Sequence, residues 1–565
     1  CPDGPDLRPC REIRRAGSQK NKIQKLPDIC MQALPVSIPY EYKALDYCAG
    51  LAVSIGLYDD PANQRQGEVI LNLSGENIVI IGSQQTGKTN ILQTIIRSAC
   101  ERYSSDQIQF YIVDFASMIL KNFEKLDHIG GVVSTNEEEK LENLFKMLLS
   151  EMASRKEQLA KIGISSYSAY LDAGFRELSQ IVLVIDNFTV LKELYPKESE
   201  ALLLISREGI ATGISIILAN TQVSGIGFKY LMNFPRRICL YCNDNSEYSN
   251  LFDRTRMFLE NVPGRAFVEV DYQIIEAQMY LSFSGEKEID RVSAIKSFVD
   301  NCNSANSGMP ARKIPMVPDI VTSDELAKNG YDLGVAAYRI PLGIDYANMQ
   351  LFHIDLLKKS VLAIVGGEKS GKTNIVKHII NCIQRQIFDN YTEVYIADDS
   401  GKLETLCEYG CVKQYVKHSS DAKAIIETVY EELLRRKEIW GVGMIDDIPM
   451  LMLVLSGHEI LDSVLQDNKT SDKLLSMVKD LKKYKVFVLL NDVDNAAINF
   501  SSPSLLKYVK EYYNVLALVN ISELRMIEVP LKFQKEYSRD IRKGDGYSFL
   551  DNKVRKIRFI LNDEF

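Results

Sequence analysis

Apolar segments without polar alternation recur along the chain, and stretches with helical periodicity separate them. In the first half these patterns predict strands at 77–82, 108–114, 181–186, 214–219 and 236–242, and helices at 88–101, 137–160 and 198–211. Strands that do not alternate are buried on both faces. We therefore expect an α/β fold in which mostly parallel sheets are covered by helices.

The second half repeats the first. The segment Ile80 to Ile96, IIGSQQTGKTNILQTII, aligns without gaps with Ile364 to Ile380, IVGGEKSGKTNIVKHII, at an offset of 284. The same offset carries YIVD, which ends at Asp114, onto YIAD, which ends at Asp398. Further strands are predicted near 360–366, 392–398, 450–455 and 485–490. A repeat at a fixed offset indicates two related domains in tandem.

Turn-forming residues suggest where these domains are joined. Asn301 to Asn306, followed by Pro310, Pro315 and Pro318, reads as a linker. Later in each repeat, the RKE at Arg155 pairs with that at Arg436. The predicted organisation is an N-terminal linker at 1–54, a first domain at 55–284, a linker at 285–339, and a second domain at 340–565.

Each repeat contains a phosphate-binding loop between a strand and a helix. Both loops match G-x-x-x-x-G-K-[ST], in which backbone N–H groups and a helix N-terminus surround phosphates and the lysine reaches the terminal ones. Thr89 and Thr373 would contact Mg²⁺. The predicted nucleotide-binding residues are Gly82, Ser83, Gln84, Gln85, Thr86, Gly87, Lys88, Thr89 and Asn90, and Gly366, Gly367, Glu368, Lys369, Ser370, Gly371, Lys372, Thr373 and Asn374. ATP with Mg²⁺ is the predicted ligand.

Composition narrows the choice of partners. With 67 Lys and Arg against 75 Asp and Glu, the net charge is −8, which does not favour nucleic acid. Eleven scattered cysteines favour a reducing compartment. Cys239 and Cys242 have the spacing of half a zinc site, but residues i and i+3 of a strand point to opposite faces, so we interpret them as core cysteines. No apolar run approaches the ~18 residues that cross a bilayer.

Seven blocks together resemble a known family. They are GSQQTGKTN, YIVDF, HIGGVV, RKEQL, LVIDNF, SREGIATGISIILANTQ and PGRAFVEV. In order and spacing they resemble the FtsK/SpoIIIE family of RecA-like motor ATPases, strongly over 55–284 and more faintly over 340–565. Two motor domains in tandem resemble the type VII secretion ATPases of the EssC/YukB/EccC kind.

This resemblance implies a cellular role. It implies a membrane-anchored ATPase at the cytoplasmic face of a bacterial membrane, which assembles into a hexamer and engages secreted WXG100 and LXG proteins. Because the chain begins with Cys1, we interpret it as part of a longer protein, whose missing N-terminal part would contact other membrane components. A DNA translocase of the same family and a non-hydrolysing scaffold stabilised by nucleotide remain alternatives.

The resemblance also assigns roles in the first domain. Asp186 would hold the metal, and Asn187 stands where family motors usually have the glutamate that activates water. An amide cannot take the proton of that water, so we expect ATP binding with slow hydrolysis. Gln222 would sense the γ-phosphate, together with Asn220 and Thr221. Arg207 is the candidate finger that reaches a neighbouring subunit's nucleotide.

The second domain departs further from the family pattern. Ser456 stands at the position of the metal-holding acid and Gly457 at that of the base. Asp446, Asp447 and Glu459 are the nearby carboxylates along the chain, and none obviously replaces them. The sensor segment Asn491 to Val493 lacks the glutamine. We therefore expect bound nucleotide, if any, to be structural or regulatory in a domain that regulates or binds substrate.

Overall fold

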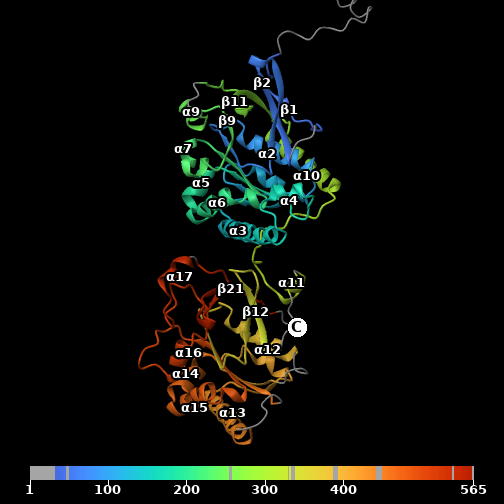
Figure 1. Ribbon diagram of the computed structural model, residues 1–565. Helices are drawn as coiled ribbons and strands as arrows, with labels where there is room; N and C mark the ends of the chain where they lie inside the picture. Colours follow the sequence, from blue (N-terminus) through green and yellow to red (C-terminus); the bar gives the residue numbers. More distant parts are fainter. Residues whose placement is uncertain are drawn as a thin grey trace, which may run out of the picture. The chain divides into compact units, whose positions relative to one another are not determined.

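The chain folds as two compact units in the computed structural model (Figure 1). Unit 1 ends at Met316 and unit 2 begins at Val317. Each unit is built on one large mixed sheet. The residues that the structure describes are 32–45, 50–252, 257–328, 330–331, 338–385, 392–440, 448–537 and 540–562.

The sheet of unit 1 has a parallel centre and an antiparallel extension. Its strands are β1 Ile38–Pro39, β2 Ala52–Asp60, β3 Arg65–Asn72, β4 Ile78–Ile81, β5 Ile108–Asp114, β6 Ile129–Ser134, β7 Gln180–Asp186, β8 Ile214–Asn220, β9 Arg236–Leu240, β10 Arg265–Val270 and β11 Gln273–Leu281. Strands β9-β4-β8-β7-β5-β6 are parallel neighbours. Strands β3-β2-β11-β10 extend the sheet as antiparallel pairs, and β1 pairs with β11.

Helices cover both faces of this sheet. They are α2 Lys88–Cys100, α3 Glu138–Lys161, α4 Tyr167–Asp172, α5 Phe188–Leu194, α6 Pro196–Glu208, α7 Val223–Ile226, α8 Phe228–Leu231, α9 Ser246–Phe252 and α10 Glu288–Ala305, with 3₁₀ turns η1 Pro61–Asn63, η2 Ile119–Phe123 and η3 Ile210–Thr212. Along β4, Ile78 and Ile80 join the core under α2 and α10, whereas Val79 and Ile81 join the core under α3, α5 and α6. A strand buried on both sides explains the uninterrupted apolar run in the sequence.

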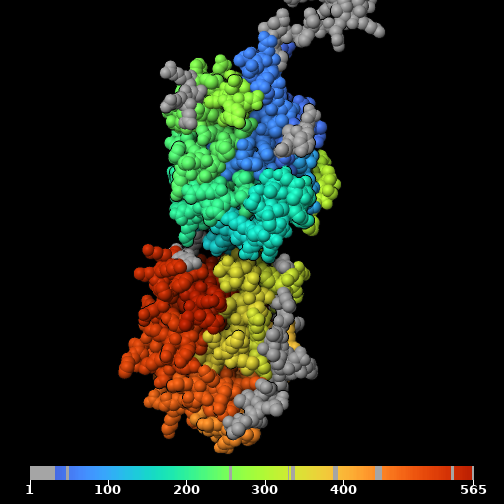
Figure 2. Space-filling view, in the orientation of Figure 1, coloured from blue at the N-terminus to red at the C-terminus, as the bar shows by residue number. Residues whose placement is uncertain are grey.

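Unit 2 repeats this architecture. Its strands are β12 Arg339–Asp345, β13 Leu351–Asp355, β14 Val361–Gly366, β15 Thr392–Asp398, β16 Val412–Val416, β17 Met450–Ser456, β18 Val486–Val493, β19 Val515–Leu518, β20 Asp545–Ser548 and β21 Arg555–Phe559. Their order, β13-β12-β21-β20-β19-β14-β18-β17-β15-β16, matches that of β3-β2-β11-β10-β9-β4-β8-β7-β5-β6 in unit 1, whereas β1 has no counterpart in the described residues. Because β12 pairs with β21, the yellow and red surfaces of this unit adjoin in Figure 2.

The helices of unit 2 are also divided between two faces. They are α11 Ser323–Lys328, α12 Lys372–Arg385, α13 Ser419–Trp440, α14 His458–Gln466, α15 Asn468–Lys479, α16 Ser504–Glu511 and α17 Leu531–Glu536, with η4 Glu404–Glu408, η5 Lys482–Tyr484 and η6 Leu550–Asn552. Helix α12 packs into one core, and α13, α14, α15 and α16 pack into the other. The predicted α/β fold with tandem domains is confirmed.

The antiparallel extension of each sheet was not predicted. Strand β3 is mostly half-buried, so its pattern is weak. The turn of the β10–β11 hairpin is formed by Asp271 and Tyr272, with φ of 49° and 63°. Glycine or asparagine usually marks such a turn in a sequence, and this turn contains neither residue type. Strand pairing in this region depends on contacts between distant segments rather than on local sequence.

Most of the segment predicted as a linker belongs to one unit or the other. Helix α10 packs in unit 1, and Ala311 N and Ile314 N donate to Asp127 O and Gly130 O of the same unit. From Val317 onward the chain belongs to unit 2, where Leu561 N donates to Val321 O at 2.7 Å. The structure thus divides the chain inside 285–339, and the hydrogen bonds above tie described residues on both sides of the division to their own unit.

Candidate nucleotide sites

The first phosphate loop joins β4 to α2 and has the backbone that an anion site requires. Gln85 and Gly87 have positive φ, 62° and 113°, which curls the loop. Lys88 Nζ donates to the carbonyl oxygens of Gly82 and Ser83 at 2.7 and 2.8 Å, so its ammonium lies within the loop. Burial lowers the pKa of Lys88, and the Asp186 carboxylate opposes that shift.

Neighbouring segments hold the loop in place. Ser83 N donates to Tyr241 O at 2.9 Å, and Asn243 N donates to Ser83 Oγ at 2.9 Å. Gly264 N donates to Thr86 O at 2.9 Å. Beside the loop lies a hollow of about 410 Å³, lined by Ser83, Gln84, Thr221, Gln222, Tyr241, Cys242, Asn243, Asp244, Glu247 and Asn261. The predicted loop and sensor residues therefore border one cavity.

Thr89 and Asp186 meet at the carboxyl edge of the sheet. Strands β4 and β7 both flank β8 in parallel register, and Thr89 Oγ1 donates to Asp186 Oδ2 at 2.7 Å. Asp186 is 1% exposed, and burial, aided by the Asp114 carboxylate, raises its pKa to about 6. A hydroxyl and a buried carboxylate side by side form the donor set that Mg²⁺ takes in P-loop sites, with phosphates and water completing its shell.

Because the pKa of Asp186 is raised, we expect the stability of unit 1 to depend on pH when neither metal nor nucleotide is bound. A carboxyl group whose pKa is higher in the folded state than in the unfolded state does not lower the free energy of unfolding at pH values below the unfolded pKa of 3.8. It lowers that free energy progressively as the pH rises from 3.8 to the folded pKa of about 6. Asp186→Asn is therefore expected to stabilise unit 1 by about 3 kcal/mol at pH 8 and by much less at pH 4. Thermal unfolding in chelator-containing buffer measures this, with the exposed Asp172→Asn as control. A gain that did not grow with pH would contradict the assignment.

Asn187 follows Asp186 in a left-handed conformation. Its φ is 74°, its N–H donates to Ala219 O at 3.0 Å, and its side-chain Nδ2 lies 3.5 Å from Phe115 O. The nearest strand-end acid, Asp114, accepts three backbone N–H bonds from the loop after β5. Because the Asp114 carboxylate already accepts these hydrogen bonds from the loop, it does not take the place of the glutamate that family motors usually have at the position of Asn187.

The segment predicted to be a sensor contacts the start of α5. Asn220 Oδ1 accepts from Thr189 N and Thr189 Oγ1 at 3.2 and 3.0 Å, and Asn220 Nδ2 donates to Gln222 O at 2.8 Å. The Gln222 side chain is exposed and borders the hollow. Thr189 was not singled out in the sequence, because its role depends on the neighbouring strand.

Two other predicted residues lie away from the phosphate loop. Asn90 Nδ2 donates to Tyr280 O, and Asn90 Oδ1 accepts from Ser282 N, so this amide ties α2 to the end of β11. Arg207 is exposed near the end of α6. The adjacent Ser206 O accepts from Asn77 Nδ2, just before β4 begins, which puts Arg207 at the edge of the sheet opposite its own phosphate loop. An arginine there cannot serve its own site.

The second phosphate loop has the same backbone but different surroundings. Gly371 has φ of 109°, and Lys372 Nζ donates to the carbonyl oxygens of Gly366 and Gly367, both at 2.6 Å. Lys372 Nζ also lies 3.0 Å from Asp492 Oδ1. In unit 1, Ala219 lies opposite Ile80 as Asn491 lies opposite Ile364, so the residue that follows at this position is Asn220, which has no charge.

The acid-bearing strand of unit 1 has no acid in unit 2. Ser456 Oγ accepts from Asn491 Nδ2 at 3.0 Å. A Cβ at Gly457 would lie 1.7 Å from Asp399 Oδ1, so the Asp399 carboxylate fills the space of the missing side chain. Asp399 Oδ2 accepts from Glu459 N at 2.9 Å at the start of α14. Asp399 and Asp492 were missed in the sequence; Asp446 and Asp447 lie outside the described residues.

The interpretation of the paired cysteines needs one correction. Cys239 and Cys242 are buried as expected, but their sulfurs lie 3.8 Å apart rather than on opposite faces. Strand β9 ends at Leu240, so alternation no longer applies at Cys242. In the described part of the chain, no three His, Cys, Asp or Glu side chains gather in a way that could hold a metal ion.

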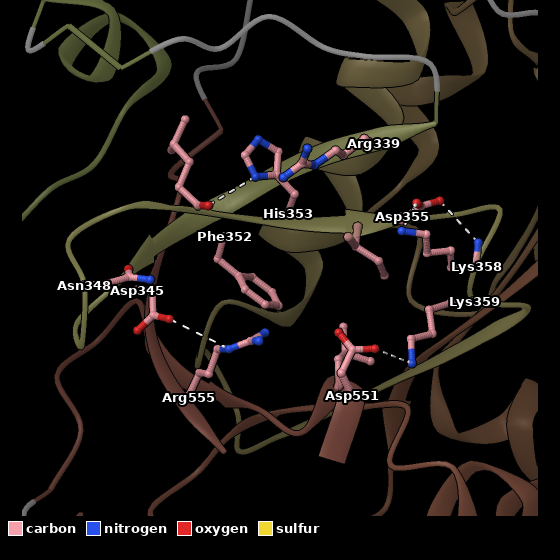
Figure 3. A pocket seen from close by; sticks show the side chains of 13 residues that line it. Arg339, Asp345, Asn348, Phe352, His353, Asp355, Lys358, Lys359, Asp551 and Arg555 are labelled. Atoms are coloured by element: carbon pink, nitrogen blue, oxygen red, sulfur yellow. Dashed lines mark hydrogen bonds and ion pairs between the residues drawn. The ribbon is translucent and has the colours of Figure 1, made fainter. Parts of the chain in front are cut away.

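A separate hollow in unit 2 lies on the β12–β13 hairpin and the start of β21. Its volume is about 440 Å³. Figure 3 shows three pairs of opposite charges along its lining: Arg555 and Asp345 at 3.9 Å, Lys359 and Asp551 at 3.1 Å, and Lys358 and Asp355 at 3.5 Å. These pairs largely balance its charge, and none of its lining residues belongs to a phosphate loop.

Comparison with known proteins decides the family. Residues 60–255 match the FtsK/SpoIIIE family. Unit 1, which contains this match, belongs to this family. The ESX secretion system protein EccC of Geobacillus thermodenitrificans is 30% identical over 363 residues, which are 64% of this chain and 24% of that protein. YukB of Bacillus subtilis is 25% identical over 571 residues, covering 97% of this chain and 36% of YukB.

Solved structures agree with this assignment at the level of the fold. EssC (ATPases 2 and 3) from Geobacillus thermodenitrificans superposes with a TM-score of 0.80 at 24% identity, covering 94% of this chain and all of that one. Thermomonospora curvata EccC (ATPases 2 and 3) in complex with a signal sequence peptide gives 0.68 at 20%, covering 94% and 96%. This chain spans 24% and 36% of the two curated relatives. In the described residues, every helix is too short or too polar to cross a membrane.

Proposed function

We propose that this chain is the tandem ATPase part of a type VII secretion ATPase, in which unit 1 binds Mg–ATP and hydrolyses it slowly. Unit 2 then acts as a regulatory or substrate-binding domain. The observation that carries the proposal is the contrast between the two sites. Thr89 meets the buried Asp186 in unit 1, whereas Ser456 and Gly457 provide no acid in unit 2.

The residues of unit 1 would have different roles in such a site. Lys88 and the loop N–H groups would hold the phosphates, and Thr89 with Asp186 would hold Mg²⁺, which supplies charge neutralisation when bound. Asn187 can orient a water molecule but cannot accept its proton. Gln222 faces the cavity as a candidate sensor. Arg207 would reach a neighbouring copy's nucleotide, and its position at the edge of the sheet opposite its own phosphate loop supports this role.

The proposed setting is the cytoplasmic face of a bacterial membrane. There a hexamer would drive export of WXG100 and LXG proteins, anchored by residues outside this chain. The names of the relatives, which are ESX and type VII secretion proteins, support this setting. The signal sequence peptide bound to Thermomonospora curvata EccC supports a peptide substrate.

Nucleotide binding is expected to depend on Lys88 far more than on Lys372. Removing the first ammonium loses charged hydrogen bonds to phosphate, and we expect Lys88→Ala to weaken binding by roughly 10-fold to 100-fold. Lys372→Ala is expected to change total binding by less than about 2-fold, since its ammonium is already paired with Asp492. Titration of the full chain with a fluorescent ATP analogue measures both. Equal losses from the two variants would contradict the assigned difference between the sites.

Two alternatives make different predictions. A DNA translocase would bind duplex DNA at low salt with an affinity that falls steeply as salt rises. The net charge of −8 argues against it, and lack of binding at low salt would exclude it. A scaffold that only binds nucleotide would show no turnover above background even with intact Mg–ATP binding, whereas slow turnover that Lys88→Ala abolishes supports the proposed enzyme.

A further inference from the structure

The ammonium of the second phosphate loop is already held by a carboxylate of its own unit. Lys372 Nζ contacts two loop carbonyl oxygens and Asp492 Oδ1, the latter at 3.0 Å. The Lys372 side chain is 11% exposed and that of Asp492 is 27% exposed, so this pair is shielded more than most surface ion pairs. Asp492 Oδ2 lies 3.7 Å from His458 Nε2, a largely exposed ring.

A local irregularity of β18 directs Asp492 toward the lysine. In the pairing of β14 with β18, Ile364 is opposite Asn491 and Val365 is opposite Val493, so Asp492 is an extra residue. It has φ of 68°. A bulge of this kind re-aims a side chain, and such bulges are common beside functional sites. In unit 1 the register Ile81 to Asn220 ends β8 without this insertion.

We propose that Asp492 sets the nucleotide affinity of the second site by occupying the ammonium that phosphate oxygens would otherwise use. This rests on the proposed function, in which unit 2 is a degenerate ATPase domain. A polyphosphate entering the loop must displace the carboxylate or bind beside a fixed negative charge. Either route weakens binding, because phosphate and carboxylate compete for the same donors.

The groups around the loop fit this assignment. Ser456 is bonded by Asn491, and Asp399 fills the space beside Gly457 and accepts the first N–H bonds of α14. In unit 1 the corresponding helix start is bonded by Asn220 through Thr189. In unit 2, side chains of the unit itself therefore contact the groups that surround the phosphate loop.

The test uses the full chain with Lys88→Ala, so that the first site is weakened and the second is measured. Asp492→Asn removes the charge and keeps a residue that tolerates positive φ, and Asp492→Gly removes the side chain at a position that suits glycine. Both are expected to raise affinity for a fluorescent ATP analogue by at least about 10-fold. Asp494→Asn, an exposed residue two positions on, makes the same change of net charge and is expected to alter affinity by less than about 2-fold.

A further substitution shows whether a gain in nucleotide affinity arises at the second site. Adding Lys372→Ala to the chain with Lys88→Ala and Asp492→Asn is expected to abolish that gain. Unchanged affinity in both Asp492 variants, with thermal unfolding like that of the parent, would overturn the proposal. A gain that survives Lys372→Ala would also overturn it. These outcomes are separate from the proposed function, which fails instead if Lys88→Ala leaves the binding and turnover of the otherwise unaltered chain intact.

Discussion

Asn187→Glu is expected to raise ATP turnover by unit 1 by about 10²-fold or more. The rest of the site is assembled, with Lys88 in the loop and Thr89 on Asp186, so the missing part is a base for the attacking water. General-base catalysis contributes about 10²–10⁴-fold. The gain should lie toward the lower end, because Asn187 has φ of 74°, a conformation that asparagine tolerates better than glutamate.

Asn187→Gln is the matched control for this variant. Glutamine has the length of glutamate and the same backbone preference, but it cannot accept a proton, so turnover should stay at the level of the original chain. Steady-state phosphate release, at saturating Mg–ATP, compares the three proteins. Adding Lys88→Ala should remove the gain and assign it to unit 1. Equal turnover by the Glu and Gln variants, with normal ATP binding, would show that a base is not what this site lacks.

Local sequence predicted most strands of the parallel half of each sheet, but not β6, β16 or β19. Strands β4, β5, β7 and β8 are buried on both faces, so their apolar runs stand out, and the glycine-rich loops that follow β4 and β14 have fixed spacing. The antiparallel extension depends on pairing between β2 and β11, segments more than two hundred residues apart. Such pairing leaves only weak local patterns when one face of the strand is half-exposed.

The residues of the candidate site that belong to one loop could be predicted from the sequence. The contacts that arise where two strands lie side by side could not. Lys88 and Thr89 follow from the loop motif alone. The partnership of Asp399 with the start of α14 arises because β15 and β17 are adjacent, with Asp398 opposite Ser456. The approach of Asp492 to Lys372 arises from a bulge in β18. Neither the adjacency of two strands nor a bulge can be recognised from the local sequence. The direction of the Cys242 side chain was wrongly predicted because β9 ends before that residue.

Arg155→Met is expected to destabilise unit 1 by about 3 to 5 kcal/mol. The Arg155 side chain is 3% exposed. Its Nη1 donates to Ser179 O, Thr212 O and Gly213 O at 2.8 to 3.3 Å, while its Nε contacts Glu151. It thereby joins α3 to the segments that lead into β7 and β8. Methionine fills much of the volume but leaves these carbonyl oxygens without their donor, each at a cost of about 1 to 3 kcal/mol when buried.

The neighbouring lysine and the second repeat supply the controls for this variant. Lys156 is 47% exposed and pairs with Glu208, so Lys156→Met should cost less than about 1 kcal/mol. Arg436 is 2% exposed and donates to Pro449 O and Tyr484 O, so Arg436→Met should destabilise unit 2 by a similar amount. If the units unfold separately, calorimetry will show one transition lowered by Arg155→Met and the other by Arg436→Met. A single transition lowered by both would mean that the units unfold together, and a cost below about 1 kcal/mol in both would mean that water satisfies these carbonyls.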